Sequence, residues 1–553
     1  MFYIKAIQFS KSLYRYLEKM IIKKSQIIAG TLLALIILAV PIVPGIQKVA
    51  GQNTEPSPTQ IDQYIRDQMV QKKIVGLSVA IVQDNEVTYL KGFGAASIKR
   101  NTQVTPQTIF DLASCSKSFT AMATLLLWND GLIDLEQPLT HYIPEFRLAD
   151  EKASDEITVR ELLNQTSGLP GNISEPVAYQ KDSNNDNSDT MKMLVAAMKK
   201  IRTDRLPGSS FEYSNLNYDL LGALVERVSG RSFDDFVQER IFTPLGMNNS
   251  TLKPDVAAGL DRADGHQMML GHIITRNIPI YHSAQPAGWV MSSAEDMAKW
   301  LLVNMNNGIL NGQQVIPASV MQLMHTPEIN FVDDGEKTSY AMGWFVGQTG
   351  DGEPVIWHGG DTPNFLSEMI ILPERNLGVV MLVNSQTSRN AHSVALGIAS
   401  LFMGSELTLP SSPWWASWAA IDHIALIALI LALVLIIGLI PYLWWQWSII
   451  RRYHRGELAP PRVGKTMKIW LFVLPATPWV FLALIATVAY VAAQVTFGFN
   501  LFITIVRFGS FAPPGIMVAA IAILVSLLLW MIALTITGYL RATARARSSG
   551  LIS

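Results

Sequence analysis

The sequence predicts an α/β domain of the α+β type, built on an antiparallel sheet flanked by helices and followed by an all-α membrane domain of three helices. Strand patterns at both ends of region 52–410 enclose helical patterns, which places the two ends of this region in one sheet. Hydrophobic residues make up 49% of the 553 residues and charged residues 16%, and the mean hydropathy is +0.25. This composition excludes a disordered chain and indicates that part of the protein lies in lipid.

The amino-terminal segment, residues 1–25, carries six lysines and arginines against the single acidic residue Glu18. Residues 26–46 then form an uncharged apolar run that is long enough to cross a bilayer core, which takes roughly 20 helical residues. This run predicts either a signal peptide cleaved near Val49 or an uncleaved signal anchor. Both alternatives leave residues 1–25 in the cytoplasm and export region 52–410.

Three further apolar runs come after a short linker, residues 411–418, and each is long enough to span a membrane. Tryptophans lie before and after the first run, as they do at the two lipid–water boundaries of membrane proteins. The predicted transmembrane helices cover residues 419–443, 469–493 and 512–540 of the membrane domain 419–553.

Positive charge predicts the orientation of these spans. The loop after the first run holds six basic residues against Glu457, and the tail after the last run holds three arginines and no acid. Both segments should be cytoplasmic, so region 52–410 is extracytoplasmic. That region has 41 acidic and 26 basic residues, a net charge of −15. The total of −1 is therefore a sum over two compartments, and the absence of a basic excess excludes nucleic acid as a partner.

Region 52–410 shows the elements of the predicted sheet and of the helices beside it. A hairpin pattern opens the region, with a turn at Asp84 and Asn85, and a second hairpin pattern closes it. The segments between them have the apolar spacing of helices that end at a glycine. The predicted hairpins are residues 76–94 and 368–384, and the predicted helices are residues 116–131 and 216–230.

Ser114 and Lys117 form a Ser-x-x-Lys motif at the start of an apolar helix. One helical turn brings the lysine beside the serine, and the helix start places a backbone N–H near a carbonyl that the serine attacks. A lysine kept neutral by burial could take the serine proton. Ser250 and Lys253 repeat the motif, but Pro254 comes directly after them, and a surface turn is the better interpretation there.

Two further motifs accompany the first pair. Tyr213–Asn215 is a Tyr-x-Asn motif, and His358–Gly360 precedes the last predicted hairpin. With these motifs the chain resembles the superfamily of serine β-lactamases, D,D-peptidases and D-aminopeptidases, whose signatures are Ser-x-x-Lys, Tyr-x-Asn and a Lys-or-His-x-Gly strand. The resemblance covers residues 55–405 and implies a β-lactamase-like serine hydrolase domain.

The resemblance also implies roles for the motif residues. Ser114 becomes the nucleophile and Lys117 its general base. Tyr213, as phenol or phenolate, shares the proton with Lys117 and passes it to the leaving group. Asn215 contacts the amide on the acyl side of the substrate.

The third motif departs from the lysine form of the family. His358 takes the place of that lysine, and an imidazole supplies less charge for a substrate carboxylate near neutral pH. The oxyanion hole implied by the resemblance uses the backbone N–H groups of Ser114 and Asp361. Cys115, the only cysteine, is interpreted as a small packing residue. The histidines have no metal-ligand spacing, so neither a metal nor a cofactor is expected.

The architecture is similar to that of membrane-anchored prodrug-activating D-asparaginyl peptidases, such as the colibactin-maturing peptidase. The phrase His-Gly-Gly-x-x-Pro-Asn-Phe, residues 358–365, adds to this resemblance. Such an enzyme removes an N-acyl-D-asparagine cap from a nonribosomal peptide or polyketide precursor during export. Asp111 and Asn364 could bind the asparagine amide; alternatively, Asp111 caps the helix and Asn364 shapes a turn.

Other functions remain open at this stage. The alternatives are a cell-wall D,D-peptidase or D-aminopeptidase, a β-lactamase-related esterase, and a catalytically retired membrane sensor. The resemblance implies a multi-pass protein of a bacterial cytoplasmic membrane whose partners are the bilayer and an acylated peptide prodrug. The spans could also support a homodimer or receive the precursor from an exporter.

Overall fold

The computed structural model describes residues 55–171, 190–333, 336–386, 391–408, 418–458 and 514–548. Several predicted segments lie outside the described residues: the cytoplasmic segment 1–25, the signal or anchor run 26–46, most of the linker 411–418 and the middle span 469–493. The α/β domain and the apolar helices that come after it are each described by themselves.

The α/β domain contains a nine-stranded sheet within the described residues, and every neighbouring pair in it is antiparallel. Its central strands come from both ends of the domain, since β1 pairs with β15, as the sequence predicted. The strands in spatial order are β10 (Ile329–Asp333), β11 (Glu336–Ala341), β12 (Trp344–Gln348), β13 (Pro354–Asp361), β14 (Leu366–Leu372), β15 (Leu377–Val383), β1 (Gly76–Gln83), β2 (Glu86–Ser97) and β3 (Thr102–Gln103).

Both predicted hairpins are confirmed. Asp84 and Asn85 connect β1 to β2 with φ values of 49° and 69°. Two left-handed residues in a two-residue loop match the right-handed twist of the flanking strands. Asn376 turns the chain between β14 and β15 with a φ of 46°.

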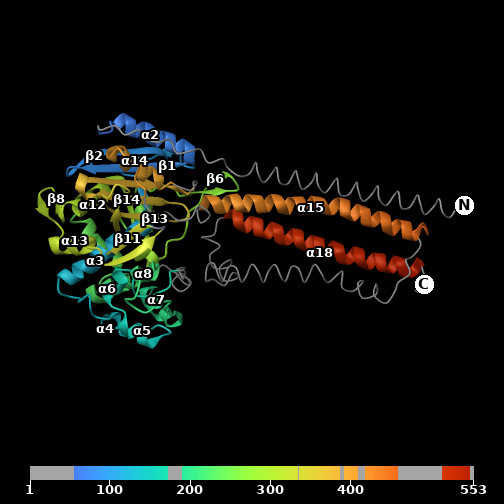
Figure 1. Ribbon diagram of the computed structural model, residues 1–553, viewed down its shortest axis with the longest axis horizontal. Coiled ribbons are helices and arrows are strands. Elements are labelled where there is room, and N and C mark those ends of the chain that lie inside the picture. Colours follow the sequence, from blue (N-terminus) through green and yellow to red (C-terminus); the bar gives the residue numbers. More distant parts are fainter. Residues whose placement is uncertain are drawn as a thin grey trace. The chain divides into compact units, whose positions relative to one another are not determined.

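Helices cover both faces of this sheet (Figure 1). α2 (Pro58–Lys72) and α14 (Ser393–Met403) pack on one face, and most of the other helices lie on the opposite face. These are α3 (Ser116–Asn129), α4 (Leu139–Tyr142), α5 (Glu151–Glu156), α6 (Val159–Leu163), α7 (Thr190–Ala197), α8 (Asn215–Ser229), α9 (Phe233–Val237), α11 (Gln285–Gly288), α12 (Ala294–Met305) and α13 (Ala318–His325). α10 (Pro254–Gly259) packs through Ala257 into a separate small cluster.

The alternation of β1 divides the apolar core between the two faces. Val79 and Ile81 pack into the cluster shared with α2 and α14. Ala80 and Val82 pack into the larger cluster formed with α3, α8 and α12. Because side chains alternate along a strand, a single strand supports both cores. The bounds of α3 and α8 agree with the helices predicted at residues 116–131 and 216–230. Gly230 ends α8 with a φ of 69°.

Smaller strand pairs lie beside the main sheet. One of them, formed by β4 (Ile109–Asp111) and β7 (Met291–Ser293), leads into the turn before α3. The other strands are β8 (Ile309–Leu310) with β9 (Gln313–Gln314), and β16 (Ser385–Gln386) with β5 (His266–Met269) and β6 (His272–Thr275).

Two helices of the described residues are long and apolar enough to cross a membrane, judged by length and composition. α15 (Trp418–His454) and α18 (Pro514–Ser548) include most of the predicted runs 419–443 and 512–540. α15 continues beyond its predicted end, so that the tryptophans expected after the span lie within the helix. A membrane domain of three helices is thus supported for its first and third members only.

α15 and α18 pack against each other along their length. The Trp530 indole N–H donates to the Leu435 carbonyl at 2.7 Å. Seven residues further along both helices, the Tyr442 and Thr537 hydroxyls lie 3.1 Å apart. Because both contacts advance in the same direction, the helices are parallel. The alternation of a three-span topology requires this of its first and third spans.

Candidate active site

A tight turn before α3 presents Ser114. The strand β4 ends at Asp111, and the 3₁₀ turn η1 (Ala113–Cys115) begins after one residue. Ala113 has a φ of 46°, a left-handed conformation that side-chain-bearing residues rarely adopt. Strained backbone of this kind persists where the surrounding structure fixes it, often at functional sites. The turn leaves Ser114 partly exposed at the beginning of a buried helix.

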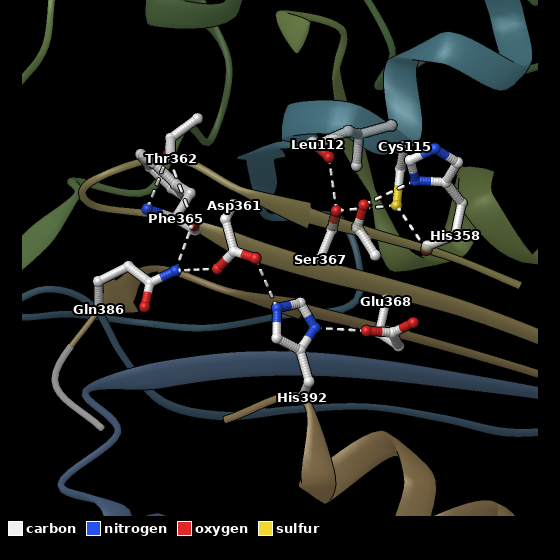
Figure 2. Close-up of polar contacts among 11 residues, drawn as sticks. Leu112, Cys115, His358, Asp361, Thr362, Phe365, Ser367, Glu368, Gln386 and His392 are labelled. Atoms are coloured by element: carbon white, nitrogen blue, oxygen red, sulfur yellow. Dashed lines mark hydrogen bonds and ion pairs between the residues drawn. The ribbon is translucent and has the colours of Figure 1, made fainter. Parts of the chain in front are cut away.

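Hydrogen bonds join the serine turn to the sheet. Cys115 is buried, and its Sγ donates to the His358 carbonyl at 3.1 Å. The Ser367 hydroxyl of β14 donates to the Leu112 carbonyl. Figure 2 shows this link between η1 and the strands β13 and β14. Burial raises the pKa of the Cys115 thiol, so this residue is a packing residue with a protonated sulfur, as expected.

Lys117 is fully buried and faces three acceptors. Its Nζ lies 2.7 Å from Asn215 Oδ1, 2.7 Å from the Ala287 carbonyl and 3.2 Å from Ser114 Oγ. The three N–H donors of an ammonium satisfy these three contacts. When the lysine loses the proton that faces Ser114, its lone pair points to the serine hydroxyl. This geometry suits a general base for the serine proton.

Tyr213 completes the group around Ser114. Its ring centroid lies 4.8 Å from the Lys117 nitrogen. Burial raises the pKa of the Tyr213 phenol well above its ordinary value, which outweighs the opposing effect of its hydrogen bond with Ser114. Of the two forms considered from the sequence, the structure favours the phenol. A phenol hydrogen-bonded to the serine can donate a proton to a group leaving the acyl carbon.

Asn215 begins α8 and holds the lysine through its side-chain oxygen. The sequence predicted this residue beside the acyl-side amide of a substrate, and that contact stays a prediction. The structure adds a positioning contact to Lys117 that the sequence did not indicate.

His358 is buried beside this group and is neutral. Burial, together with the smaller effect of the Lys117 charge, lowers the pKa of its imidazole to about 3. Nδ1 lies 2.7 Å from the Gly359 carbonyl, which can only accept, so Nδ1 carries the proton. Nε2 therefore bears a lone pair, and within the described residues this buried atom has no hydrogen-bond partner. The third motif offers an acceptor here in place of a cation.

The end of β13 passes close to the nucleophile. β12 pairs with β13 only as far as Trp357, so among the described strands the edge beyond it is open. A Cβ atom added to Gly360 would lie 2.9 Å from the Ser114 nitrogen and 2.4 Å from the Leu112 carbonyl oxygen. Only glycine permits this approach. It brings the next residue, Asp361, into the region where the resemblance expects the second oxyanion donor.

Asp111 and Asn364, the predicted asparagine-binding pair, both have internal partners. Arg262 Nη2 lies 2.7 and 3.0 Å from the two carboxylate oxygens of Asp111, whose side chain is only 2% exposed. Asn364 donates to the Arg276 carbonyl at 2.9 Å and accepts from the Thr362 hydroxyl at 3.2 Å. A substrate amide would have to use the lone pairs of both side chains and the second Asn364 N–H that these bonds leave over.

The second Ser-x-x-Lys sequence lies elsewhere and is not the surface turn that the sequence suggested. Ser250 is only 4% exposed. Its hydroxyl lies 2.9 Å from the Asp296 carboxylate and 2.7 Å from the Ser292 hydroxyl. The prediction was wrong because contacts with β7 and α12, more than 40 residues away, bury this serine.

Two residues near the site were not predicted from the sequence. Arg262 neutralises Asp111, and His392 bridges Asp361 and Glu368 behind β13. Neither belongs to a short motif, and each is distant in sequence from its partners. Within the described residues, no cluster of three or more His, Cys, Asp and Glu side chains could hold a metal ion.

A known protein family matches the domain that carries this site. Residues 61–401 match the protein family described as Beta-lactamase. The chain belongs to the beta-lactamase family. Membership gives it the family's serine hydrolase fold.

Curated relatives share this domain at moderate identity. Protein flp of Staphylococcus aureus (strain MW2) is 28% identical over 331 residues, which cover 60% of this chain and 64% of the relative. The unguisins hydrolase ungD' of Aspergillus campestris (strain IBT 28561) is 27% identical over 365 residues, which cover 62% of this chain and 65% of the relative. The chain thus spans slightly less than two thirds of these relatives.

A solved structure has the same fold. The octameric penicillin-binding protein homologue from Pyrococcus abyssi aligns with a TM-score of 0.54 at 26% identity. The alignment covers 64% of this chain and 79% of that chain.

Proposed function

We propose that this protein is a membrane-bound serine peptidase that removes an N-acyl-D-asparagine cap from a nonribosomal peptide or polyketide precursor during export. The observation that carries the hydrolase chemistry is the arrangement of Lys117, Ser114 and Tyr213. The buried amine lies 3.2 Å from the serine oxygen, and the phenol is hydrogen-bonded to the same serine. The precursor without its cap would be an active antibiotic or toxin. Because the cap is removed only during export, the producing cell would be protected.

The reaction proceeds through an acyl-enzyme. The Lys117 lone pair takes the proton of Ser114 as Oγ attacks the D-asparaginyl carbonyl. The backbone N–H groups of Ser114 and Asp361 stabilise the negative charge on the carbonyl oxygen. Tyr213 donates a proton to the departing amine, and the amide C–N bond breaks. Water then attacks the ester and releases N-acyl-D-asparagine.

The state of His358 supports a substrate without a carboxylate at that position. A neutral imidazole whose Nε2 carries a lone pair would repel an anion and accept a hydrogen bond from an N–H or hydroxyl group. A penicillin or a D-Ala-D-Ala peptide presents a carboxylate on its leaving side. The precursor amide proposed here needs no charge partner, which ranks it above the D,D-peptidase and β-lactamase alternatives.

Membrane tethering supports an acylated substrate. Each buried methylene of an acyl chain contributes about 0.8 kcal/mol to membrane binding. A lipidated precursor is therefore concentrated at the bilayer surface. A domain joined to membrane helices would meet it there, and the length and composition of α15 and α18 support such helices.

A substrate comparison tests the proposal. Membranes containing the full chain receive an N-myristoyl-D-asparaginyl amide, its L-asparaginyl epimer, an acyl-D-Ala-D-Ala peptide and a chromogenic cephalosporin. The expected result is hydrolysis of the first compound alone, which disappears with Ser114→Ala. Preference for either of the last two compounds would overturn the D-asparaginyl assignment in favour of a cell-wall or β-lactam substrate.

Esterase activity is a second candidate that the same histidine favours, because an ester leaving group also lacks the carboxylate. A long-chain acyl ester added to the comparison separates the two functions.

The intact arrangement of Lys117, Ser114 and Tyr213 disfavours a retired sensor, which would tolerate loss of the residues needed for turnover. Full biological effect of a Ser114→Ala protein would support the sensor instead.

A further inference from the structure

The two glycines of the third motif face different neighbours on opposite sides of β13. In front, Gly360 lies against the backbone of the serine turn. Behind, a Cβ atom on Gly359 would lie 3.0 Å from Glu368 Oε2 and 3.2 Å from the His392 ring carbon Cε1. Here β13 is only one backbone thick, with the nucleophile on one side and the His392 ring on the other.

His392 joins two carboxylates behind this part of the strand (Figure 2). Its Nε2 lies 2.8 Å from Asp361 Oδ2, and its Nδ1 is hydrogen-bonded to Glu368 Oε2. Carboxylates accept and do not donate, so an imidazolium with two N–H donors satisfies both contacts. Burial lowers the pKa of His392, but the two carboxylates outweigh it and raise the pKa well above the ordinary value.

Asp361 is held from two sides. Besides His392, the Gln386 amide donates to Asp361 Oδ1 at 2.5 Å. Glu368, the other partner of His392, is only 5% exposed and belongs to the adjacent strand β14. The imidazolium therefore connects Asp361, the last residue of β13, to the buried Glu368 of β14.

We propose that His392 is a positioning residue for the oxyanion hole: through Asp361 it holds the end of β13 so that the Asp361 N–H points to the carbonyl oxygen under attack. The inference rests on the proposed serine hydrolase function. Beyond Trp357 one edge of β13 has no ladder partner among the described strands, while the other edge stays paired with β14 as far as Asp361 and Leu366. The side-chain contacts of Asp361 with His392 and Gln386 add to that ladder at the end of the strand. Loss of an oxyanion-hole donor costs about 10²- to 10³-fold in rate, and misplacement costs part of that.

The rate at which a fluorophosphonate probe labels Ser114 tests this role in membranes containing the full chain. The serine oxygen displaces fluoride from phosphorus, and the developing charge on the phosphoryl oxygen uses the same oxyanion hole. His392→Ala should lower the labelling rate about 10-fold or more. The variant also leaves the buried Glu368 carboxylate without its cation, so the unfolding temperature should fall, and labelling is measured at a temperature at which the variant is fully folded.

Arg375→Gln provides a matched control. Arg375 forms a two-point ion pair with Glu353, just before the opposite end of β13. The side chains are 33% and 25% exposed, similar to His392. This variant also removes a cation from a carboxylate contact, but the pair is remote from Ser114. Its labelling rate should equal that of the wild type.

A double-variant experiment separates positioning from general loss of structure. Asp361→Ala keeps the backbone N–H and removes the carboxylate that His392 holds. If His392 acts through Asp361, His392→Ala should cause no further loss in the Asp361→Ala background. Losses that multiply, or wild-type labelling of His392→Ala, would overturn the positioning role alone. A wild-type protein whose Ser114 takes no label would instead overturn the proposed function, and the positioning role with it.

Discussion

The two Ser-x-x-Lys sequences of this chain have opposite environments. Lys117 is fully buried and directs its amine at Ser114. Lys253 is 44% exposed and lies 2.8 Å from Asp235, whose hydrogen bond raises the pKa of the lysine. The first lysine can serve as a base, whereas the second stays a cation and is directed away from Ser250. Burial and the placement of acceptors, which the four-residue pattern does not contain, separate a reactive pair from a structural one.

The largest expected difference between the two sequences is in activity. Lys117→Met keeps the length of the side chain and removes the base, so hydrolysis of the N-myristoyl-D-asparaginyl amide should fall about 10²- to 10⁴-fold. Lys253→Met is the control and should hydrolyse the amide at the wild-type rate. Equal losses in both variants, or none in Lys117→Met, would contradict the distinction.

Tyr213 should matter most for substrates with a poor leaving group. Tyr213→Phe removes the proton donor, so amide hydrolysis should slow about 10²-fold or more. A nitrophenyl ester releases a stable anion without this proton and should be affected much less. The ratio of the two rates is the measurement, and the control is Tyr142→Phe, at a partly buried tyrosine whose hydroxyl accepts from the Asp134 backbone N–H. A uniform loss on both substrates would assign Tyr213 a structural role.

The Ser114 site should also be sensitive to acid through His358. Its pKa is about 3 in the folded protein and 6.5 ordinarily, so only the unfolded state takes up this proton between those values. The free energy of unfolding should therefore fall as the pH drops below about 6.5, by at most about 1.4 kcal/mol per pH unit for this group. His358→Gln should flatten this slope in unfolding measurements from pH 7 to pH 4. An unchanged slope would argue against a neutral, buried imidazole.

The smallest effects are expected at the second sequence. Ser250→Ala removes buried hydrogen bonds to Asp296 and Ser292 and should lower the free energy of unfolding by about 1 kcal/mol without changing turnover. Lys253→Met should change the free energy of unfolding by less than about 1 kcal/mol, because Lys253 and its nearer partner Asp235 are exposed. Thermal unfolding of both variants measures these differences. Loss of activity in folded Ser250→Ala would show that this serine reaches the chemistry.

Local patterns made much of the fold predictable from the sequence. The hairpin at Asp84 and Asn85 follows from turn residues between alternating strands, and the end of α8 follows from Gly230. The order of the three motifs indicated which serine stands with a lysine and a tyrosine. These features depend on neighbours in sequence or on a known family pattern.

Contacts between distant segments could not be predicted in this way. His392 meets Asp361 and Glu368 only because α14 packs behind β13 and β14. Arg262 reaches Asp111 across about 150 residues and occupies the carboxylate that the sequence offered to a substrate. Ser250 is buried for the same reason. Polar contacts that arise from tertiary packing produce no periodic pattern in the sequence.

The acyl-enzyme itself tests the central claim most directly. Membranes with the full chain are mixed with the N-myristoyl-D-asparaginyl amide, quenched in acid within the first turnovers and digested for mass spectrometry. We expect a myristoyl-asparaginyl ester on the peptide that contains Ser114, and none in the Ser114→Ala protein. Acylation of another residue, or cleavage of the substrate by the Ser114→Ala protein at the wild-type rate, would contradict the claim.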